Sequence, residues 1–496
     1  MKTLKAVFLS FLALCVPFRY SWADDQNVSL EQAREVAAYA VAIEQGSDKY
    51  DVASTRLVYQ LNNPVLGIPT AYFFNVGQDA FAIVAGHRAS YPLLALSIED
   101  TLQVNNMPPA MQWWMESYSE MITDAQLQSV QPTEAVDKDW RKYEEHTRVP
   151  SMSKAANWLI DDKWDQGTET YPTYNLYCPV HYHKYCVTGC VATALAMIVH
   201  YFQFPAVGRY TKAYYETYTV DGEDGIRTSP TATTIYFNQT FYDYDNMPIE
   251  LSRTTDSAQI KAVAQLMFHI GVAVNAVYGV DGTSAYSTDV PGAMKRFFKY
   301  KNSSQVFRSS LTDAKWMDTL RYNIDRKIPL YISASSPVGD DIHANGHAFL
   351  CHGYHPSSTN LFRMNWGWGG SSNGWYNMAT VDGLTPSNYN FNTRQAAIIG
   401  MTPPDDSNRY LGIRDIQPVE LYAAYPNPAT YQVVIPYSME TGASVLMQIF
   451  DMAGRLMEQH MLVPGNGEVR VNVASYPKGV YLYRVKGGVM RKFVVQ

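Results

Sequence analysis

Two polar breaks divide the 496-residue chain into three blocks, and this division constrains the fold more than any other feature. The first break runs from Gln131 to Pro150 and the second from Pro403 to Asn408. Both are rich in charged, proline or small polar residues and offer little to an apolar core, so we expect them to be exposed linkers. At roughly 150 residues per domain, the chain has room for about three domains. We predict domains over residues 24–148, 149–404 and 418–496, with 405–417 as a linker.

The composition favours a well-packed protein and argues against a nucleic-acid partner. Apolar residues make up 47% of the chain and charged residues 17%, which is enough apolar side chain for sizeable cores. The 46 acidic residues outnumber the 39 lysines and arginines, whereas proteins that bind nucleic acid usually carry a basic excess. Five cysteines are too few for a disulfide framework to hold so long a chain together.

The first 23 residues have the pattern of an export signal. Two lysines precede an apolar stretch from Ala6 to Pro17, and Ser21-Trp22-Ala23 places small residues before a cleavage point. Leu14 is too large for the position before the cysteine of a lipoprotein signal, so Cys15 is not expected to carry a lipid. No later segment approaches the ~20 consecutive apolar residues of a membrane helix. We predict a signal peptide over residues 1–23 and a soluble, exported mature protein without stable membrane insertion.

Periodicity predicts mixed helix and strand in the first two blocks and strands alone in the third. Turn residues recur about every dozen positions after residue 418, as in a small β-sandwich. The expected helices cover residues 30–40, 111–122 and 189–201, and the expected strands cover residues 70–76, 80–85, 328–332 and 348–353.

Cys190 is the strongest candidate nucleophile. It lies at the start of the apolar helix, where unpaired backbone N–H groups and the helix dipole favour a thiolate. Small neighbours such as Gly189 would let a substrate backbone approach closely. The alternative is a buried cysteine that acts as a small apolar side chain.

A base and an orienting group follow later in the chain. His347 stands at the head of an apolar strand, and Asn365-Trp366 falls on the next predicted strand. A hairpin would bring the Asn365 amide beside the imidazole, and Trp366 could shield that hydrogen bond from water. With Cys190 these residues form a nucleophile, base and orienter arrangement, although His347 alone could be an ordinary strand-end histidine. The backbone N–H of Cys190 and the side chain of Gln166 could stabilise an oxyanion, unless Gln166 is a plain loop residue.

These motifs resemble the streptopain family of papain-like cysteine peptidases. The resemblance rests on Trp164-Asp165-Gln166-Gly167, Thr188-Gly189-Cys190-Val191-Ala192, Gly346-His347-Ala348-Phe349 and Asn365-Trp366-Gly367-Trp368-Gly369-Gly370. It implies that Cys190 is the nucleophile, His347 the base, Asn365 the orienter, Trp366 its cover and Gln166 an oxyanion donor. It also implies substrate contacts at Gly189, Ser284, Ala285 and Gly346. Residues 70–122 look like the family's inhibitory propeptide, and the likeness spans about residues 28–403.

The C-terminal block resembles a type IX secretion sorting domain. Tyr425-Pro426-Asn427-Pro428, residues 450–455 and residues 476–485 carry this likeness. It implies passage through the periplasm and the outer-membrane secretion machinery, followed by release or attachment at the cell surface. The alternative is a carbohydrate-binding sandwich, although no aromatic platform is evident.

Together these expectations describe an α+β fold: an α+β inhibitory propeptide, a papain-like peptidase domain and a small all-β sandwich. The predicted function is a secreted cysteine endopeptidase zymogen that cleaves proteins or peptides and is inhibited by its own propeptide. The resemblance implies no metal or organic cofactor. The alternatives are a thiol amidase acting on cell-wall peptides and a non-catalytic surface adhesin.

The remaining cysteines call for different expectations. Cys351 lies on an apolar strand and should be buried and inert. Cys178 and Cys186 lie eight residues apart in a loop and could pair as a disulfide or, with His181 and His183, bind a metal. We favour no metal there, because the loop reads as an insertion between two peptidase motifs.

Overall fold

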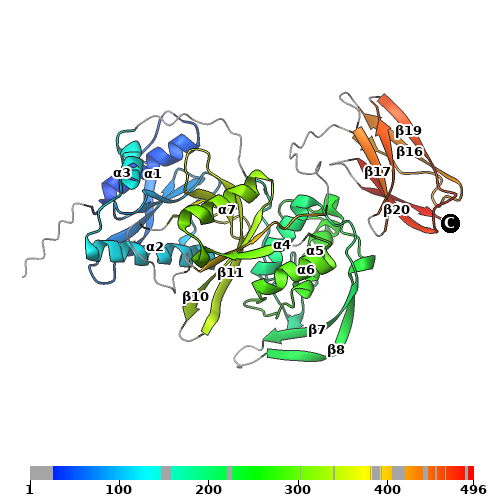
Figure 1. Ribbon diagram of the computed structural model, residues 1–496, viewed down its shortest axis with the longest axis horizontal. Coiled ribbons are helices and arrows are strands. Elements are labelled where there is room, and N and C mark those ends of the chain that lie inside the picture. The colour runs from blue at the N-terminus through cyan, green and yellow to red at the C-terminus, as the bar shows by residue number, and fades with distance from the viewer. Residues whose placement is uncertain are drawn as a thin grey trace, which may run out of the picture.

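The computed structural model describes residues 26–47, 49–146, 158–181, 183–219, 226–301, 303–338, 341–379, 381, 391, 394–404, 419–439, 445–452, 455–463, 465–485 and 490–496. The predicted signal peptide and the predicted linker over residues 405–417 lie outside this part of the chain. Figure 1 shows an N-terminal part, a central part joined to it by a sheet, and a separate C-terminal part. No helix in the described ranges combines the length and apolar character needed to cross a bilayer.

The N-terminal part packs helices against a four-stranded antiparallel meander. Helix α1 begins at a capping box, in which Ser29 and Gln32 satisfy each other's backbone N–H groups. Helix α2 begins with Pro109 at its first position, where a missing N–H costs nothing. The elements are α1 (Leu30–Glu44), β1 (Thr55–Asn62), β2 (Pro69–Val76), β3 (Ala80–Ala85), β4 (Leu93–Ser97), η1 (Val104–Asn106), α2 (Pro109–Gln128) and α3 (Glu134–Glu144).

Helix α3 corrects the expectation that residues 131–150 form an exposed linker. Its buried side chains, Val136, Trp140 and Tyr143, lie on one face at helical spacing. The Trp140 indole donates to the Ser90 carbonyl at 2.8 Å, which fixes the helix to the N-terminal part. Three apolar residues at helical spacing suffice to pack this helix. The average composition of the segment, which is dominated by charged residues, does not reveal them.

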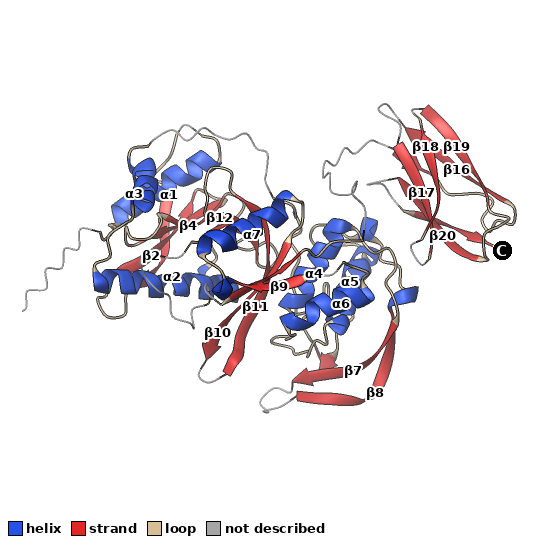
Figure 2. Cartoon of the chain, in the orientation of Figure 1, coloured by secondary structure: helices blue, strands red, loops and turns tan. Residues whose placement is uncertain are grey.

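The central part has a helical half and a sheet half (Figure 2). Helix α4 is buried along most of its length within the helical half, beside α5. The elements of the helical half are β5 (Val180–His181), β6 (Lys184–Tyr185), α4 (Cys190–Phe202), β7 (Thr211–Thr219), β8 (Ile226–Tyr236), η2 (Phe237–Gln239), η3 (Tyr244–Asn246), α5 (Ser257–Ala273), η4 (Ser287–Asp289) and α6 (Val290–Phe297). Those of the sheet half are β9 (Ser304–Phe307), η5 (Arg308–Ser310), α7 (Asp313–Asp325), β10 (Leu330–Val338), β11 (Asp341–Tyr354), β12 (Leu361–Asn365), β13 (Gly374–Asn377) and β14 (Gln395–Ile399).

One ten-stranded sheet runs through both parts, in the order β1-β2-β3-β4-β13-β12-β11-β10-β14-β9. The junction is the antiparallel pair β4–β13, in which Trp375 faces Leu96 and Tyr376 faces Ala95. Gly374 permits this approach, because a Cβ there would lie 2.7 Å from the Leu96 carbonyl oxygen. One apolar cluster joins the N-terminal part to the sheet half, so the two share a core.

The C-terminal part is an all-β sandwich with its own apolar cluster. Its two sheets have the strand orders β15-β16-β19 and β18-β17-β20-β21. The strands are β15 (Val419–Leu421), β16 (Gln432–Met439), β17 (Val445–Asp451), β18 (Leu456–Leu462), β19 (Gly465–Asn472), β20 (Gly479–Val485) and β21 (Arg491–Val495). The predicted fold class, α+β followed by a small β-sandwich, is confirmed.

Candidate active site

Cys190 is the first residue of α4, and the backbone before it accepts only glycine. Gly189 has φ +84°, a left-handed conformation that side chains rarely adopt. A Cβ at this position would also lie 2.7 Å from the Thr283 carbonyl oxygen. Cys190 is partly exposed, whereas the ten residues that follow it in the helix, Val191 to His200, are all buried. The fold therefore presents one thiol at the positive end of a buried helix.

Electrostatics around Cys190 favour the thiolate. Burial alone would raise the pKa of the thiol, but the charge of His347 and a hydrogen bond with it hold the net pKa below the ordinary value. The backbone N–H groups of Ala348 and Val191 add to this lowering. Burial would likewise lower the pKa of His347, but the Cys190 thiolate and the Trp366 carbonyl raise it overall. The two shifts together describe a thiolate–imidazolium pair.

His347 lies on β11, opposite Ala334 of β10. Its Nε2 is 3.3 Å from the backbone carbonyl oxygen of Trp366, which leaves Nδ1 for the thiol. As an imidazolium, the ring donates from Nε2 to this carbonyl. The group that orients the imidazole is therefore a main-chain oxygen.

The predicted contact between Asn365 and His347 is not present. The register places Asn365 opposite Leu350, three residues beyond the histidine. Its Nδ2 donates to the Asp162 carbonyl at 2.6 Å, and its Oδ1 accepts from the Gly367 N–H at 3.0 Å. Asn365 thus links the peptide between Trp366 and Gly367 to the backbone at Asp162.

The Trp366 side chain also differs from the prediction that it shields a hydrogen bond between Asn365 and His347. It is fully buried, donates to the Ser372 carbonyl at 3.0 Å, and packs against Phe349 with ring centroids 4.9 Å apart. The indole near the histidine is that of Trp368, whose ring centroid lies 6.5 Å from the imidazole. Sequence reasoning missed Trp368, although the Trp-Gly-Trp spacing offered two candidates.

Gln166 lies beside the loop segment that leads to Cys190. Its backbone carbonyl accepts from the N–H of Thr188 at 2.9 Å. The side-chain amide has no hydrogen-bond partner within the described ranges and is available to a ligand. The predicted role of Gln166 as an oxyanion donor stays a prediction.

The predicted substrate-contact residues lie on segments that meet the start of α4 or His347. Ser284 forms a bridge with Val277, one residue after the Thr283 that packs on Gly189. Ala285 packs against the apolar cluster that Cys190 also contacts, and Gly346 is exposed beside His347. A further neighbour is the buried Tyr331, whose hydroxyl bonds Ser287 at 2.7 Å. Burial and the Cys190 charge raise the pKa of Tyr331, and no sequence motif pointed to it.

The other thiols differ from Cys190. Cys178, Cys186 and Cys351 are buried and are not joined in a disulfide, so the suggested Cys178–Cys186 pairing is not formed among the described residues. Burial raises the pKa of both Cys178 and Cys351, which keeps them protonated. His181 is engaged with Glu216 at 2.9 Å, and no group of three metal-ligating side chains occurs in the described part of the chain.

Comparisons with known proteins agree with this geometry. Residues 164–376 match the peptidase C10 family, residues 25–122 match the Spi protease inhibitor family, and residues 423–496 match a secretion system C-terminal sorting domain. The chain is 26% identical over 435 residues to the thiol protease/hemagglutinin PrtT of Porphyromonas gingivalis, covering 86% of this chain but only 47% of PrtT. It is 28% identical to streptopain of Streptococcus pyogenes over 350 residues, covering 67% of this chain and 80% of streptopain.

A solved structure extends the likeness to three dimensions. A fragment of Prevotella intermedia prointerpain A superposes with a TM-score of 0.55 at 27% identity. The match covers 71% of this chain and 99% of that fragment.

Proposed function

This chain belongs to the peptidase C10, or streptopain, family of cysteine peptidases, and from that premise we propose that it is a secreted endopeptidase made as a zymogen. The observation that carries the proposal is the pairing of Cys190, at the start of a buried helix, with His347 on the neighbouring strand. Nucleophile and base are in hydrogen-bond contact, and both have pKa shifts that favour the charged pair.

The reaction follows from these positions. The Cys190 thiolate attacks the peptide carbonyl, and the developing oxyanion is stabilised by the Cys190 backbone N–H and the Gln166 amide. The His347 imidazolium then protonates the leaving amine, and an acyl-enzyme thioester remains. Water attacks the thioester while His347 accepts its proton, and collapse of the intermediate releases the carboxylic acid product and restores the Cys190 thiolate and the His347 imidazolium.

We assign positioning roles to the residues behind His347. The Trp366 carbonyl holds Nε2, and Asn365 fixes that carbonyl through its two backbone contacts. Trp368, whose ring centroid lies 6.5 Å from that of the imidazole, takes the covering role that was predicted for Trp366. Ser284, Ala285, Gly346 and Gly189 frame the approach of the substrate backbone.

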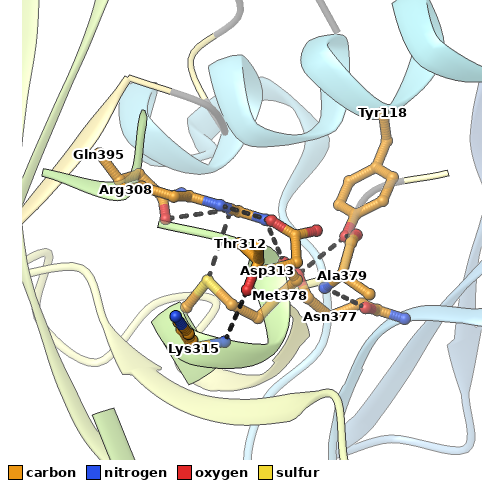
Figure 3. Close-up of polar contacts among 9 residues, drawn as sticks. All are labelled: Tyr118, Arg308, Thr312, Asp313, Lys315, Asn377, Met378, Ala379 and Gln395. Atoms are coloured by element: carbon orange, nitrogen blue, oxygen red, sulfur yellow. Dashed lines mark hydrogen bonds and ion pairs between the residues drawn. The ribbon is translucent and has the colours of Figure 1, made fainter. Parts of the chain in front are cut away.

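The N-terminal inhibitor domain contacts residues 377–379, at the end of β13 in the peptidase domain. The Tyr118 hydroxyl from α2 lies 3.0 Å from the Asn377 carbonyl oxygen and 2.5 Å from that of Ala379 (Figure 3). From the opposite side, buried Arg308 donates to the Met378 carbonyl at 2.6 Å. Residues 377–379 are therefore clamped between the inhibitor and the peptidase, and we propose that this clamp keeps the cleft from adopting its working form.

The sorting domain implies that the protein is secreted or bound at the cell surface. We propose that a cleaved signal peptide first brings it to the periplasm, and that the outer-membrane secretion machinery then recognises the sandwich. Its substrates outside the cell are proteins or peptides.

A casein zymogram of the activated protein, with and without iodoacetamide, tests the function. We expect a cleared band that alkylation removes. No clearing of casein, together with cleavage of peptidoglycan stem peptides, would replace the endopeptidase with a cell-wall amidase.

A further inference from the structure

A buried histidine–carboxylate contact lies at the far end of helix α4, outside the reacting groups. His200, in the last turn of α4, places Nδ1 at 2.9 and 3.0 Å from the two carboxylate oxygens of Asp162. Both residues are less than a tenth exposed. The Trp164 indole stacks on the imidazole with centroids 4.9 Å apart, which fixes the ring plane.

Asp162 joins this pair to the groups behind His347. Its backbone carbonyl accepts the 2.6 Å hydrogen bond from Asn365. Asn365 in turn holds the Gly367 N–H, next to the Trp366 carbonyl that meets His347. A continuous series of contacts therefore runs from the end of α4 to the catalytic imidazole.

The same segment carries the oxyanion donor. Gln166 follows Asp162 by four residues, and between them the Trp164 carbonyl accepts from Gly369 N–H at 3.2 Å. Asp162 thus contacts both helix α4, through His200, and the loop after β12 that carries the Trp366 carbonyl, and it lies in the same loop segment as Gln166. Cys190 and His200 belong to one rigid helix and lie about 15 Å apart along its axis.

Stability alone is a weak reason for such a pair. The desolvation of a buried polar pair offsets most of its attraction, so a well-packed apolar pair is often as stable. The His200–Asp162 contact instead fixes the position of the backbone at Asp162 relative to helix α4.

We propose that Asp162 and His200 are positioning residues for the peptidase reaction, linking helix α4 through Asn365 to the orientation of His347. This inference rests on the proposed function and adds residues that do not touch the substrate. His200 acts through Asp162 and Asn365, so its effect belongs in kcat and in the reactivity of Cys190, with little change in KM.

Single variants of the full-length, activated enzyme give the first test. His200→Leu should lower kcat on a peptide substrate by about 10- to 100-fold, with KM within about twofold, because small misplacements of catalytic groups cost this much. His200→Asn retains a donor close to the position of Nδ1 and should restore most of the activity. The control is His269→Leu, because His269 is also buried in the helical half and contacts Tyr242 at 3.0 Å, with no link to Asn365.

A double-variant cycle separates positioning from simple destabilisation. If His200 acts through Asn365, then adding His200→Leu to Asn365→Ala should cause little further loss in kcat. Adding His269→Leu to Asn365→Ala should multiply the two separate effects. The rate of Cys190 alkylation against pH should shift in His200→Leu but keep its wild-type midpoint in His269→Leu.

Three results would overturn the inference while leaving the peptidase function intact. These are wild-type kcat in His200→Leu, a multiplicative loss in the His200→Leu/Asn365→Ala variant, or equal losses in the His200 and His269 variants. If His200→Leu fails to fold, His200→Asn and His200→Gln decide the question, and equal kcat in these two would count against a directed Nδ1 contact. Failure of the wild-type enzyme to cleave any peptide would instead remove the proposed function.

Discussion

At the scale of single residues, the reactivity of Cys190 depends on its neighbours more than on the thiol. Burial opposes the thiolate, and only the charge of His347 and the nearby N–H groups reverse this effect. Gly189 contributes by its lack of a side chain, since Thr283 occupies the space that a Cβ would need.

We expect Cys190→Ala and His347→Ala each to abolish hydrolysis in a folded, secreted protein, because acylation needs both groups. Asn365→Ala should be milder, since it loosens the Trp366 carbonyl and leaves the base in place. Purified variants assayed on a fluorogenic peptide test this, and near wild-type turnover in either alanine variant of the pair would contradict the assignment.

The pKa shifts predict a bell-shaped dependence of kcat/KM on pH. The active ion pair forms as pH rises through the lowered pKa of Cys190 and is lost as pH rises through the raised pKa of His347. In His347→Ala, burial is no longer offset, so the pKa of Cys190 should rise above its ordinary value. Mass spectrometry after limiting iodoacetamide at mildly acidic pH should find Cys190 labelled first in the wild type and unlabelled in His347→Ala.

Gly189→Ala should lower kcat/KM by about 100-fold or more, because the shift needed to relieve the 2.7 Å contact moves the thiol. Gly292→Ala is the matched control, since a Cβ there meets no atom within 4 Å. Activity and melting temperature of the two variants check this, and equal behaviour would show that the backbone at residue 189 tolerates a side chain.

The residues whose chemistry is local were the ones that the sequence could locate. The Cys190 motif at a helix start is visible in the sequence, and so is the His347 motif, although His347 lies in the middle of β11 and not at the head of a strand as expected. The orienter of His347 is a carbonyl, and every residue has one, so no motif could single it out. Trp366 and Trp368 lie beyond the end of β12, in a glycine-rich loop whose path the sequence pattern does not fix, so their positions could not be predicted.

At the scale of elements, helix α2 reaches furthest from the inhibitor into the peptidase. Its Trp114 packs against Trp366 with centroids 5.8 Å apart, and its Tyr118 holds residues 377–379. Helix α3 shows why composition misled at the first break, since its apolar face is only three residues long.

Tyr118→Phe should weaken latency, because it leaves the Asn377 and Ala379 carbonyls without their buried donor, at a cost of about 1–3 kcal/mol. The rate of self-processing of the full-length protein should rise. Tyr72→Phe is the control, because the Tyr72 hydroxyl is equally tied to a carbonyl, that of Val28, within the inhibitor alone. A faster rate in both variants would point to general loosening of the inhibitor.

Glu44, at the end of α1, should make the contact between inhibitor and peptidase sensitive to acid. Its carboxylate meets His355 and the Trp375 indole, each at 2.8 Å. Burial raises its pKa, but these two hydrogen bonds and Arg363 lower it overall. A lowered folded-state pKa means that the stabilisation is present above the ordinary glutamate pKa of about 4.3 and is lost as pH falls through the folded value.

Thermal denaturation of the Cys190→Ala zymogen, with and without Glu44→Gln, measures this contribution. The two melting temperatures should differ at pH 7 and converge below about pH 4. A difference that persists unchanged at pH 3 would mean that Glu44 acts through packing rather than charge.

At the scale of the whole molecule, the sequence predicted the α+β and all-β regions of the chain. It did not predict that the first two regions share one sheet and one apolar core. The alternation after residue 418 was enough to identify a sandwich. The shared ten-stranded sheet could not be predicted from the sequence, because β4 and β13 pair residues nearly 280 positions apart and no local sequence pattern indicates that pairing.

Deleting residues 418–496 should leave peptidase activity intact, since the sandwich has its own core, but should prevent export. Activity in the medium and in cell fractions measures both effects, and Cys190→Ala with an intact sandwich controls for secretion of an inactive protein. Normal activity in the medium from the truncated protein would refute the sorting role.

The β4–β13 junction also determines what happens after the connection between inhibitor and peptidase is cut. While the chain is intact, β4 sits beside β13 at a high effective molarity, so even a modest pairing stays closed. After cleavage, the inhibitor is held only by non-covalent contacts, and dilution outside the cell favours its dissociation. Activation outside the cell is then one-way in practice, and the departed strand leaves β13 with a bare edge that a passing extended chain could occupy.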